Sequence, residues 1–592
     1  MKLMPVHRSC AILAILVRAA APAQQTYTLG PDSQPNDAVP KGTVTRHELP
    51  PGKVYPGVPH NYAIYVPARY DAAKPAPYMV FLDGSGALGN AQRVPVVFDN
   101  LIARGELPPL IGIFVDPGVL PASRDTAMAR FHRILEYDSI DGRFARFLET
   151  ELIAEAAKKY NLSKDPSAHG IAGVSTGAVG AFSAAWNRPD LFRRVLSFIG
   201  TFVHMRGADS LPAMIRRTEP KPLRVFLEAG KNDHVLPGHP FGTFYAGSWP
   251  INNQLMFEAL QFAGYDVKLE YGENAHNMQH GAAILPDALR WLWRDYGKPI
   301  EPRPPMAMDL PGWDPRAQVY SVIQQGKPWE PIAGDFRSIA GIAADKDGRV
   351  FVADPAANRI WSVEGGKASV FVEKSGGATA LRTAPDGRLY ASQPAARRIV
   401  SYGPEGTAKP TVRDVVADDL AITASGAIYY LDAARQTIGV TGADGRKSVV
   451  HQGGFEAPSA IALSPDHSLL LVADAKSRFN WSFQIRPDGS LASGEPFYRV
   501  DMAEASTRGS AGVTADSIGQ AYFATALGIQ LCEQNGRCAA ILAKPQPGDL
   551  ERIAFGGPDL GWLHAAQGAK LFRRSVKTRG VDAPVKPPRP PL

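Results

Sequence analysis

The chain of 592 residues is too long for a single hydrophobic core, so two or three domains are expected. Its hydrophobic fraction of 45% and charged fraction of 20% are those of a soluble globular protein and exclude an intrinsically disordered chain. The net charge of +7 is thinly spread, and no basic helix with interleaved aromatic residues occurs, which argues against nucleic-acid binding.

The first residues have the pattern of a secretory signal. Lys2 and Arg8 give a positive start, residues 10–17 form a short apolar run, and Ala-Pro-Ala at 21–23 supplies small residues for cleavage. We therefore expect residues 1–23 to be removed and the protein to be secreted or periplasmic; the alternative is a frayed N-terminal helix. No other apolar run reaches the roughly 18 residues of a membrane-spanning helix, so no membrane span is predicted.

Residues 24–297 alternate short apolar strands with helical stretches. Several of these strands are continuous apolar runs, as parallel strands buried on both faces require. Strand alternating with helix predicts a three-layer α/β sandwich. The predicted strands are 61–67, 77–84, 111–118, 170–175, 194–200, 224–230 and 267–273; the predicted helices are 141–161, 177–190, 252–264 and 285–297.

Residues 298–316 are rich in proline and predict a semi-rigid linker. From 317 to 577 no strong amphipathic helix occurs, and a strand–turn–strand unit recurs six times. Such a period predicts one four-stranded blade per repeat, hence an all-β six-bladed propeller. Residues 578–592 predict a disordered Pro-rich tail. The residues that mark the six turns are Gly348, Gly387, Gly426, His467, Gly519 and Gly561.

Two cysteines, Cys532 and Cys538, flank the dipeptide Asn535-Gly536. That dipeptide is typical of a two-residue type I′ hairpin turn. In the resulting register Cys538 faces Glu533, and the two thiols point to opposite faces of the hairpin. This register argues against a disulfide, which needs a loop of odd length or a bulge; the sequence leaves open whether the two cysteines are bonded.

The segment Gly173-Val-Ser175-Thr-Gly177 is the one G-x-S-x-G match in the chain. A β-branched strand precedes Ser175 and a helix start follows it, which is the context of a nucleophile elbow. There the nucleophile needs a strained backbone, and side chains at the two glycine positions would clash. Ser175 is therefore the predicted nucleophile.

A serine hydroxyl needs a base to take its proton and an acid to orient that base. Asp233 and His276 each come just past the carboxyl end of a later strand, in the order Ser, acid, His that α/β-hydrolases use. We predict Asp233 as the orienting acid and His276 as the general base. The rival residues are Glu228, which lies within a strand, Asp266 and His280.

The N–H of Thr176, at the helix start, is a predicted oxyanion donor. A second donor is expected after an earlier strand, where Gly84 or Ser85 lets the backbone approach the substrate. Arg133 and Trp249 are candidates for lining the substrate pocket, with packing as the alternative role for each.

His276 and His280 also form an H-x-x-x-H pattern. It lies in a glycine-containing loop and lacks the Glu that follows the first His in zinc hydrolases, so no zinc site is predicted. No other cofactor is predicted.

Several blocks between about residues 50 and 297 resemble the enterochelin-esterase-like branch of the α/β-hydrolases, which also includes feruloyl and acetyl-xylan esterases. The blocks include IAGVSTGAVGAFSAAW, RVFLEAGKND, GENAHNMQHG and the R-x-x-E-Y-D segment within FHRILEYDS. The resemblance implies a Ser175–Asp233–His276 triad and hydrolysis of an ester. It does not fix the acid or the alcohol.

The repeats of the second region resemble gluconolactonase, senescence-marker-protein and strictosidine-synthase propellers, most closely in PSAIALSPDHSLLLVAD and GVTADSIGQAYFATALGIQLCEQNGR. Lactonases of that group hold a divalent cation on the axis with a Glu, an Asn and an Asp. Here residues 336–345 offer no such Glu, and Ser459 and Ala511 replace the other two ligands. A propeller without lactonase activity is predicted. The alternative is a shifted metal site built on Asp354, Asp432 or Asp474.

The predicted function is that of a secreted serine esterase acting on carbohydrate-linked acyl groups, with a structural or substrate-binding propeller. The substrate would be a small-molecule or polysaccharide ester. One alternative is a siderophore esterase; another is a calcium-dependent lactonase in the propeller. The sequence predicts no oligomeric state.

Overall fold

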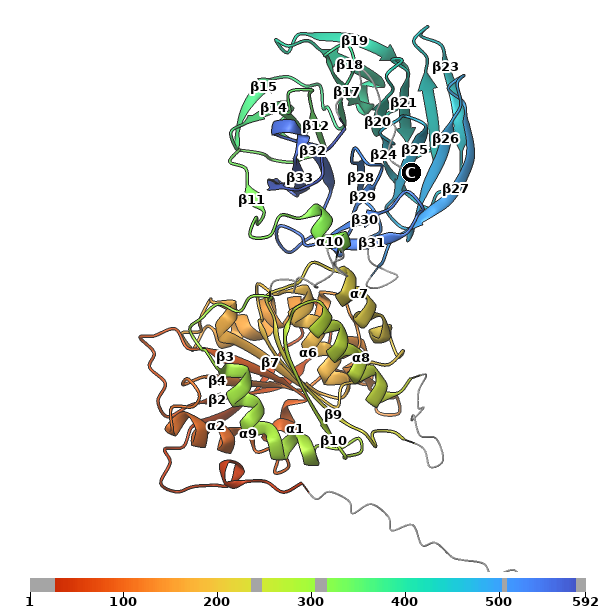
Figure 1. Cartoon of the computed structure of the whole chain (residues 1–592). Helices are drawn as coiled ribbons and strands as arrows, with labels where there is room; N and C mark the ends of the chain where they lie inside the picture. The colour runs from red at the N-terminus through yellow and green to blue at the C-terminus, as the bar shows by residue number, and fades with distance from the viewer. Residues whose placement is uncertain (1–26, 236–246, 304–316, 503–507, 582–592) are drawn as a thin grey trace, which may run out of the picture.

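The computed structural model describes residues 27–235, 247–303, 317–502 and 508–581. The predicted signal at 1–23, most of the predicted linker and most of the predicted tail lie outside these residues. The chain forms an α/β domain followed by a six-bladed propeller, which lies above the first domain in Figure 1. In the described residues, no helix is both long and apolar enough to cross a membrane.

The first domain is built on an eight-stranded sheet of order β1-β2-β4-β3-β7-β8-β9-β10. The two pairings at the β1 edge are antiparallel and the others are parallel. The seven predicted strands are all present; β1, which the sequence analysis missed, is an exposed edge strand. The strands are β1 (Thr43–Leu49), β2 (His60–Val66), β3 (Tyr78–Leu82), β4 (Ile111–Val115), β7 (His169–Val174), β8 (Arg194–Phe198), β9 (Arg224–Gly230) and β10 (Asp266–Gly272).

Helices cover both faces of this sheet, so the predicted three layers are confirmed (Figure 1). One core lies under α3 (Arg133–Tyr137), α4 (Arg143–Phe147), α6 (Thr176–Asn187), α7 (Leu211–Arg217) and α8 (Trp249–Phe262). The other lies under α1 (Gly84–Leu88), α2 (Val94–Ala103) and α9 (Gln279–Trp293). The helix predicted at 141–161 is interrupted: after α4 come a π-helical stretch (Leu148–Ile153) and α5 (Ala154–Ala156).

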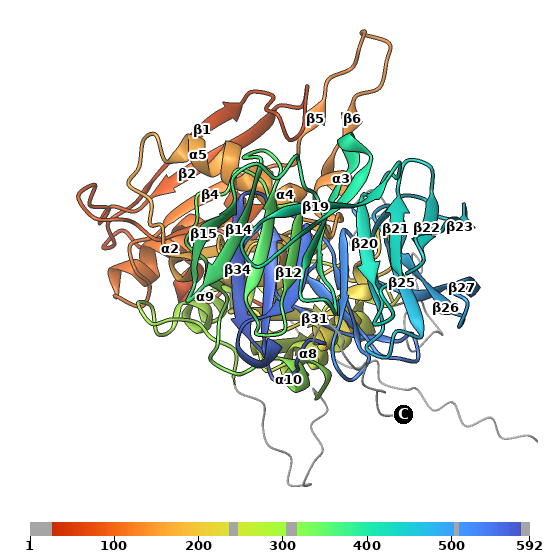
Figure 2. The same cartoon turned by 90° about the horizontal axis from the view of Figure 1, so that it is seen from above.

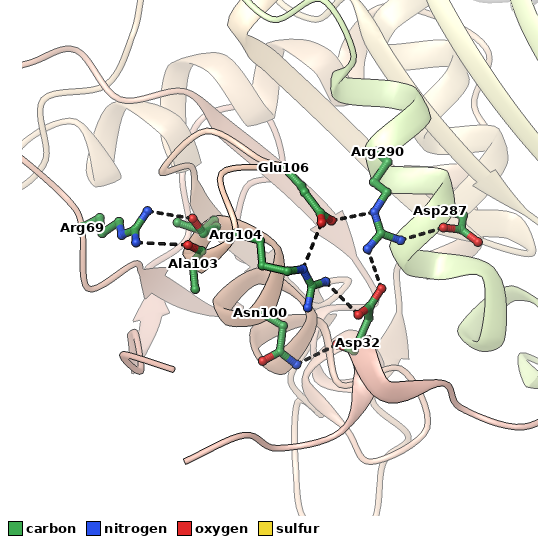
Figure 3. A network of polar contacts seen from close by, with 9 residues as sticks. Asp32, Arg69, Asn100, Ala103, Arg104, Glu106, Asp287 and Arg290 are labelled. Atoms are coloured by element: carbon green, nitrogen blue, oxygen red, sulfur yellow. Dashed lines mark hydrogen bonds and ion pairs between the residues drawn. The ribbon is translucent and has the colours of Figure 1, made fainter. Parts of the chain in front are cut away.

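A polar network fastens the start of the described chain to the first domain (Figure 3). The Asp32 carboxylate accepts from Arg104 at 2.7 Å and from Arg290 at 2.5 Å. Both guanidiniums also donate to Glu106, at 3.0 and 2.7 Å. These bonds join the short 3-10 helix Pro31–Ser33 to the C-terminal end of α2 and to α9.

The second domain consists of six four-stranded sheets, which confirms the predicted propeller (Figures 1 and 2). Five blades are consecutive in sequence, and the sixth is completed by β11, which pairs with β34 at the other end of the domain. The short helix α10 (Ala317–Val322) packs against the propeller. The blades are β12 (Gly341–Ala344), β13 (Val350–Asp354), β14 (Arg359–Glu364) and β15 (Lys367–Val372); β16 (Leu381–Thr383), β17 (Leu389–Gln393), β18 (Arg398–Tyr402) and β19 (Ala408–Arg413); β20 (Asp419–Ile422), β21 (Ile428–Asp432), β22 (Thr437–Thr441) and β23 (Lys447–Gln452); β24 (Pro458–Leu463), β25 (Leu469–Asp474), β26 (Phe479–Ile485) and β27 (Leu491–Arg499); β28 (Gly512–Ala515), β29 (Ala521–Ala524), β30 (Ile529–Cys532) and β31 (Cys538–Leu542); β32 (Arg552–Gly556), β33 (Trp562–Gln567), β34 (Lys570–Ser575) and β11 (Glu330–Pro331).

The two-residue turn expected at Asn535-Gly536 is not formed, and Cys532 and Cys538 are joined by a disulfide. The Glu533 N–H donates to the Arg537 carbonyl, so three residues form the loop, and Gly536 takes a φ of 87° within it. This loop places Cys532 opposite Cys538, and a β-bulge follows between Cys532 and Leu531. The odd loop thus brings both sulfurs to one face of the hairpin.

The first domain contacts the outer strand β31 of one blade. Thr218 forms a parallel bridge with Ile541, and the Glu219 N–H donates to the Ile541 carbonyl at 2.8 Å. The Glu219 carboxylate accepts from both terminal nitrogens of Arg574, at 2.8 and 2.7 Å. A segment of the first domain therefore covers the edge of a propeller blade, and an ion pair closes the contact.

Candidate functional site

Ser175 occupies a sharp turn between β7 and α6. Its backbone dihedrals, φ 58° and ψ −122°, lie in a strained region for a residue with a side chain. A Cβ atom on Gly173 would lie 1.9 Å from the Gly177 carbonyl oxygen, so this close approach requires glycine at position 173. The backbone thus has the features expected of an elbow that projects the Ser175 hydroxyl.

The side chains of Ser175, His276 and Asp233 form a continuous hydrogen-bonded chain. His276 Nε2 lies 2.9 Å from Ser175 Oγ, and His276 Nδ1 lies 2.8 Å from Asp233 Oδ1. Asp233 follows β9 and is 1% exposed, and His276 follows β10. This arrangement can take a proton from the serine and stabilise the resulting imidazolium.

Thr201, which the sequence analysis missed, also contacts the serine. Its Oγ1 lies 3.0 Å from Ser175 Oγ, and its N–H donates to the Ser175 carbonyl at 3.1 Å. The indole N–H of Trp249 donates to the Thr201 hydroxyl at 3.2 Å. Trp249 is a predicted pocket residue. Its side chain is 3% exposed, and besides the bond to Thr201 its ring contacts the His276 ring, with the centroids 5.9 Å apart. The position of Thr201, just past β8, was the signal available in the sequence.

Two of the rival residues, Glu228 and His280, pair with each other beneath the site, at 2.9 Å. Burial raises the pKa of Glu228, while the bond from His280 opposes the shift. The third rival, Asp266, lies at the start of β10, at the other end of the strand from the site, and pairs with Arg224 and Arg294.

One cluster among the described residues has a geometry that a metal ion could use: Asp233, His234 and His276, with ligand atoms within 4.8 Å of one another. Asp233 and His276 are already bonded to each other, so an ion there would compete with the bond that orients His276. The His234 ring packs on His276, with the centroids 4.3 Å apart.

The predicted oxyanion donors differ in their surroundings. Thr176 is the first residue of α6, where the helix offers no internal acceptor for its N–H. The N–H of Ser85 donates to Asp116 at 2.9 Å and its hydroxyl binds the same carboxylate, so an oxyanion would have to compete with Asp116 for this N–H. Gly84 begins α1, and a Cβ there would lie 2.5 Å from the Phe114 carbonyl carbon. The close approach of the Phe114 backbone therefore requires glycine at position 84, and the role of Gly84 as an oxyanion donor stays a prediction.

Arg133, the other predicted pocket residue, links the loop after β3 to the elbow. Its guanidinium donates to both oxygens of Asp83, at 2.8 and 2.7 Å, and to the Val174 carbonyl at 3.4 Å. About a third of the side chain is exposed. Its main contacts therefore hold Asp83 and Val174, on either side of the site.

Asp138 is a buried acid that follows α3. It is 1% exposed, and neither carboxylate oxygen has a hydrogen-bond partner in the described structure. Burial raises its pKa to about 7, although Arg133 and Arg206 act in the opposite direction. This acid therefore changes charge near neutral pH.

Two family models match the chain, one in each domain. Residues 55–240 match the esterase family, and residues 306–565 match the SMP-30/gluconolactonase/LRE-like region. A curated relative, the iron(III) enterobactin esterase of Dickeya dadantii (strain 3937), is 26% identical over 246 residues, covering 39% of this chain and 50% of the relative. The chain thus matches about half the length of that relative.

Solved structures resemble each domain separately. A gluconolactonase from Xanthomonas campestris is 18% identical and has a TM-score of 0.39, covering 44% of this chain and 93% of the other. The enterobactin esterase of Shigella flexneri is 19% identical and has a TM-score of 0.34, covering 43% of this chain and 62% of the other.

Proposed function

We propose that this protein is a serine carboxylic-ester hydrolase whose reaction takes place at Ser175, with a Ser175–His276–Asp233 triad. The observation that carries the proposal is the continuous chain of hydrogen bonds, 2.9 and 2.8 Å long, at a strained elbow. The match of residues 55–240 to the esterase family supports the same reaction class.

In the first half of the reaction, Ser175 Oγ attacks the ester carbonyl carbon and His276 Nε2 takes the hydroxyl proton. The carbonyl π electrons move to the oxygen, and the charge meets the N–H of Thr176 at the positive end of α6. The tetrahedral intermediate collapses, the C–O bond to the alcohol breaks, and His276 gives its proton to the leaving alkoxide. Asp233 keeps the imidazolium oriented throughout.

In the second half, water replaces the alcohol. His276 takes a proton from the water, the hydroxide attacks the acyl-enzyme, and the bond between Ser175 Oγ and the acyl carbon breaks. The proton returns to Ser175, and a carboxylic acid leaves. Each ester and water therefore yield one alcohol and one acid, with no redox step and no cofactor.

Two ester classes are proposed as substrates. A siderophore ester is favoured by the curated relative, whose name specifies iron(III) enterobactin. A carbohydrate-linked acyl ester, acetyl or feruloyl, follows from the resemblance of the IAGVSTGAVGAF and R-x-x-E-Y-D segments to carbohydrate esterases. We also propose that the signal at 1–23 directs the enzyme out of the cytoplasm, where it would act on either ester. A polysaccharide that carries such acyl groups is the proposed partner.

The test is a substrate panel of acetyl-xylan, methyl ferulate and a catecholate siderophore triester, run on the wild type and on Ser175→Ala. We expect one substrate class to be hydrolysed with a much higher kcat/KM, and Ser175→Ala to lose this activity and the hydrolysis of p-nitrophenyl acetate. A fluorophosphonate probe should label Ser175 in the wild type. Full activity in the folded Ser175→Ala protein would overturn the proposal.

A further inference from the structure

The six inner strands of the propeller, β12, β16, β20, β24, β28 and β32, contact one another in a closed ring. Three charged side chains converge inside it: Arg382 of β16, Asp419 of β20 and Arg552 of β32. With backbone from the other three strands they line a cavity of only about 10 Å³. This space is at most that of one water molecule, so these side chains fill this layer of the axis. A larger cavity of about 170 Å³ lies next to it, lined by the residues that follow along the six inner strands.

Arg552 joins three blades. Its Nε donates to the Ala340 carbonyl at 2.8 Å, just before β12, and its Nη1 donates to the carbonyls of Ala511, just before β28, and Glu551. A single guanidinium therefore binds backbone oxygens at the start of the first blade (Ala340), the fifth blade (Ala511) and the sixth blade (Glu551). Its planar set of donors suits this bridging.

Arg382 and Asp419 join the remaining blades. The Nη2 atom of Arg382 donates to the Ile461 carbonyl of β24 at 2.9 Å and to the Asp419 carboxylate at 3.2 Å. Asp419 in turn accepts the N–H of Ile461 at 2.9 Å. Together the two arginines and the aspartate have partners in all six blades.

The axial cation implied by the resemblance to lactonases does not fit these residues. The Ser459 hydroxyl, at the position of the Asn ligand, donates to the Ser510 carbonyl at 2.6 Å. Ala511, at the position of the Asp ligand, has no side-chain oxygen, and Arg552 binds its carbonyl. A hard divalent cation needs several oxygen ligands with net negative charge, whereas two guanidiniums and one carboxylate leave a positive charge.

We infer that Arg552 and Arg382 take the place of an axial metal ion: they join the six blades of the propeller and occupy the position from which a metal-dependent lactonase would act. The propeller is then a metal-independent scaffold. This inference does not rest on the esterase reaction, since every contact that carries it lies in the second domain.

The first experiment measures the thermal unfolding of the full-length protein with calcium, with manganese and with EDTA. A cation present at a hundredfold excess over its Kd would raise the melting temperature by about 5 °C or more. We expect the melting temperature to stay within about 1 °C in all three conditions. A calcium- or manganese-dependent rise that Asp419→Asn removes would overturn the inference.

The second experiment compares Arg552→Met with Arg446→Met, whose side chain is 92% exposed. Without the Arg552 guanidinium the carbonyls of Ala340 and Ala511 lose a partner, so we expect the propeller to melt about 5 °C or more below the wild type. Arg446→Met should melt as the wild type does. Equal melting of both variants and the wild type would contradict the bridging role.

The third experiment does not require a folded arginine variant. The Ser175→Ala protein is incubated with an aldonolactone and calcium or manganese, and ring opening is followed by acid release. We expect the lactone to open at the same rate with the protein as without it. Turnover that EDTA abolishes would show a working metal centre in the propeller and overturn the inference.

Discussion

The Glu228 carboxylate bridges the segments that carry the proposed base and Thr201, and His280 holds it in place. His280 Nδ1 lies 2.9 Å from Glu228 Oε1, and both residues are buried. The same oxygen accepts the side-chain amide of Asn274, two residues before His276, at 3.2 Å. The other oxygen accepts the Ile199 N–H at 3.3 Å, two residues before Thr201.

We predict that Glu228→Gln lowers kcat about tenfold, or ~1.4 kcal/mol in activation free energy, with little change in KM. An amide nitrogen facing the Ile199 N–H places two donors against each other, which shifts Thr201 and His276 without touching the substrate. Steady-state kinetics with p-nitrophenyl acetate measure kcat and KM separately. The control is Glu258→Gln on the exposed face of α8. A variant with an unchanged kcat would show that the pair only fills the core.

Thr201→Val is predicted to slow the reaction by about ten- to thirtyfold. The hydroxyl fixes Ser175 Oγ, and valine also leaves the buried Trp249 indole without this acceptor. Thr201→Ser keeps the hydroxyl and should keep most of the activity. The kcat values of the two variants are compared with that of Trp249→Phe, which removes only the indole donor and should cost less. Equal losses in valine and serine variants would point to packing as the role of Thr201.

The sequence was most informative where local pattern sets the structure. Buried runs such as β8 and β9 were predictable because parallel strands covered on both faces need apolar residues throughout. The blades were predictable because each repeat places a turn residue at the same point, and five of the six have a positive φ. The edge strand β1 was missed, since its exposed face reads as polar.

Features set by long-range contacts were not predictable in the same way. Thr201 reaches Ser175 across 26 positions of sequence, and only the adjacency of β7 and β8 brings them together. The bond from the Ser85 N–H to Asp116, 31 positions away, was likewise not readable from the local pattern. The disulfide depended on one residue of loop length, which shifts the register and moves a side chain to the other face.

Asp138 should make stability depend on pH between about 4 and 7. Its pKa is about 7 in the fold against an ordinary value of 3.8, so the folded state binds the proton more tightly than the unfolded state. The contribution is therefore fully present below the ordinary value and is lost as pH rises through about 7. At ~1.4 kcal/mol per pKa unit the loss has an upper bound of about 4 kcal/mol.

Asp138→Asn, which cannot ionise, should remove this dependence. The melting temperature of the variant minus that of the wild type is measured by calorimetry at pH 4 and at pH 8. We expect this difference to be more positive at pH 8. Asp141→Asn, at a less buried position nearby, is the control. A constant difference between Asp138→Asn and the wild type across the range would contradict the raised pKa.

The ion pair between Glu219 and Arg574 should decide whether the two domains unfold together. Its side chains are 15% and 6% exposed, so removing one partner leaves a charge in the interface and costs about 3 kcal/mol. We predict that Arg574→Met separates one calorimetric transition into two, with the propeller and the first domain melting independently.

Arg573→Met is a matched control, because the neighbouring guanidinium pairs with Glu330 within the propeller. In Glu219→Gln/Arg574→Met no buried charge is left unpaired, so the double variant should recover part of the loss. A single transition in Arg574→Met, at the temperature of the control, would show that the other contacts between the domains, such as the β31 bridge and the Arg217–Asp501 ion pair, hold them together.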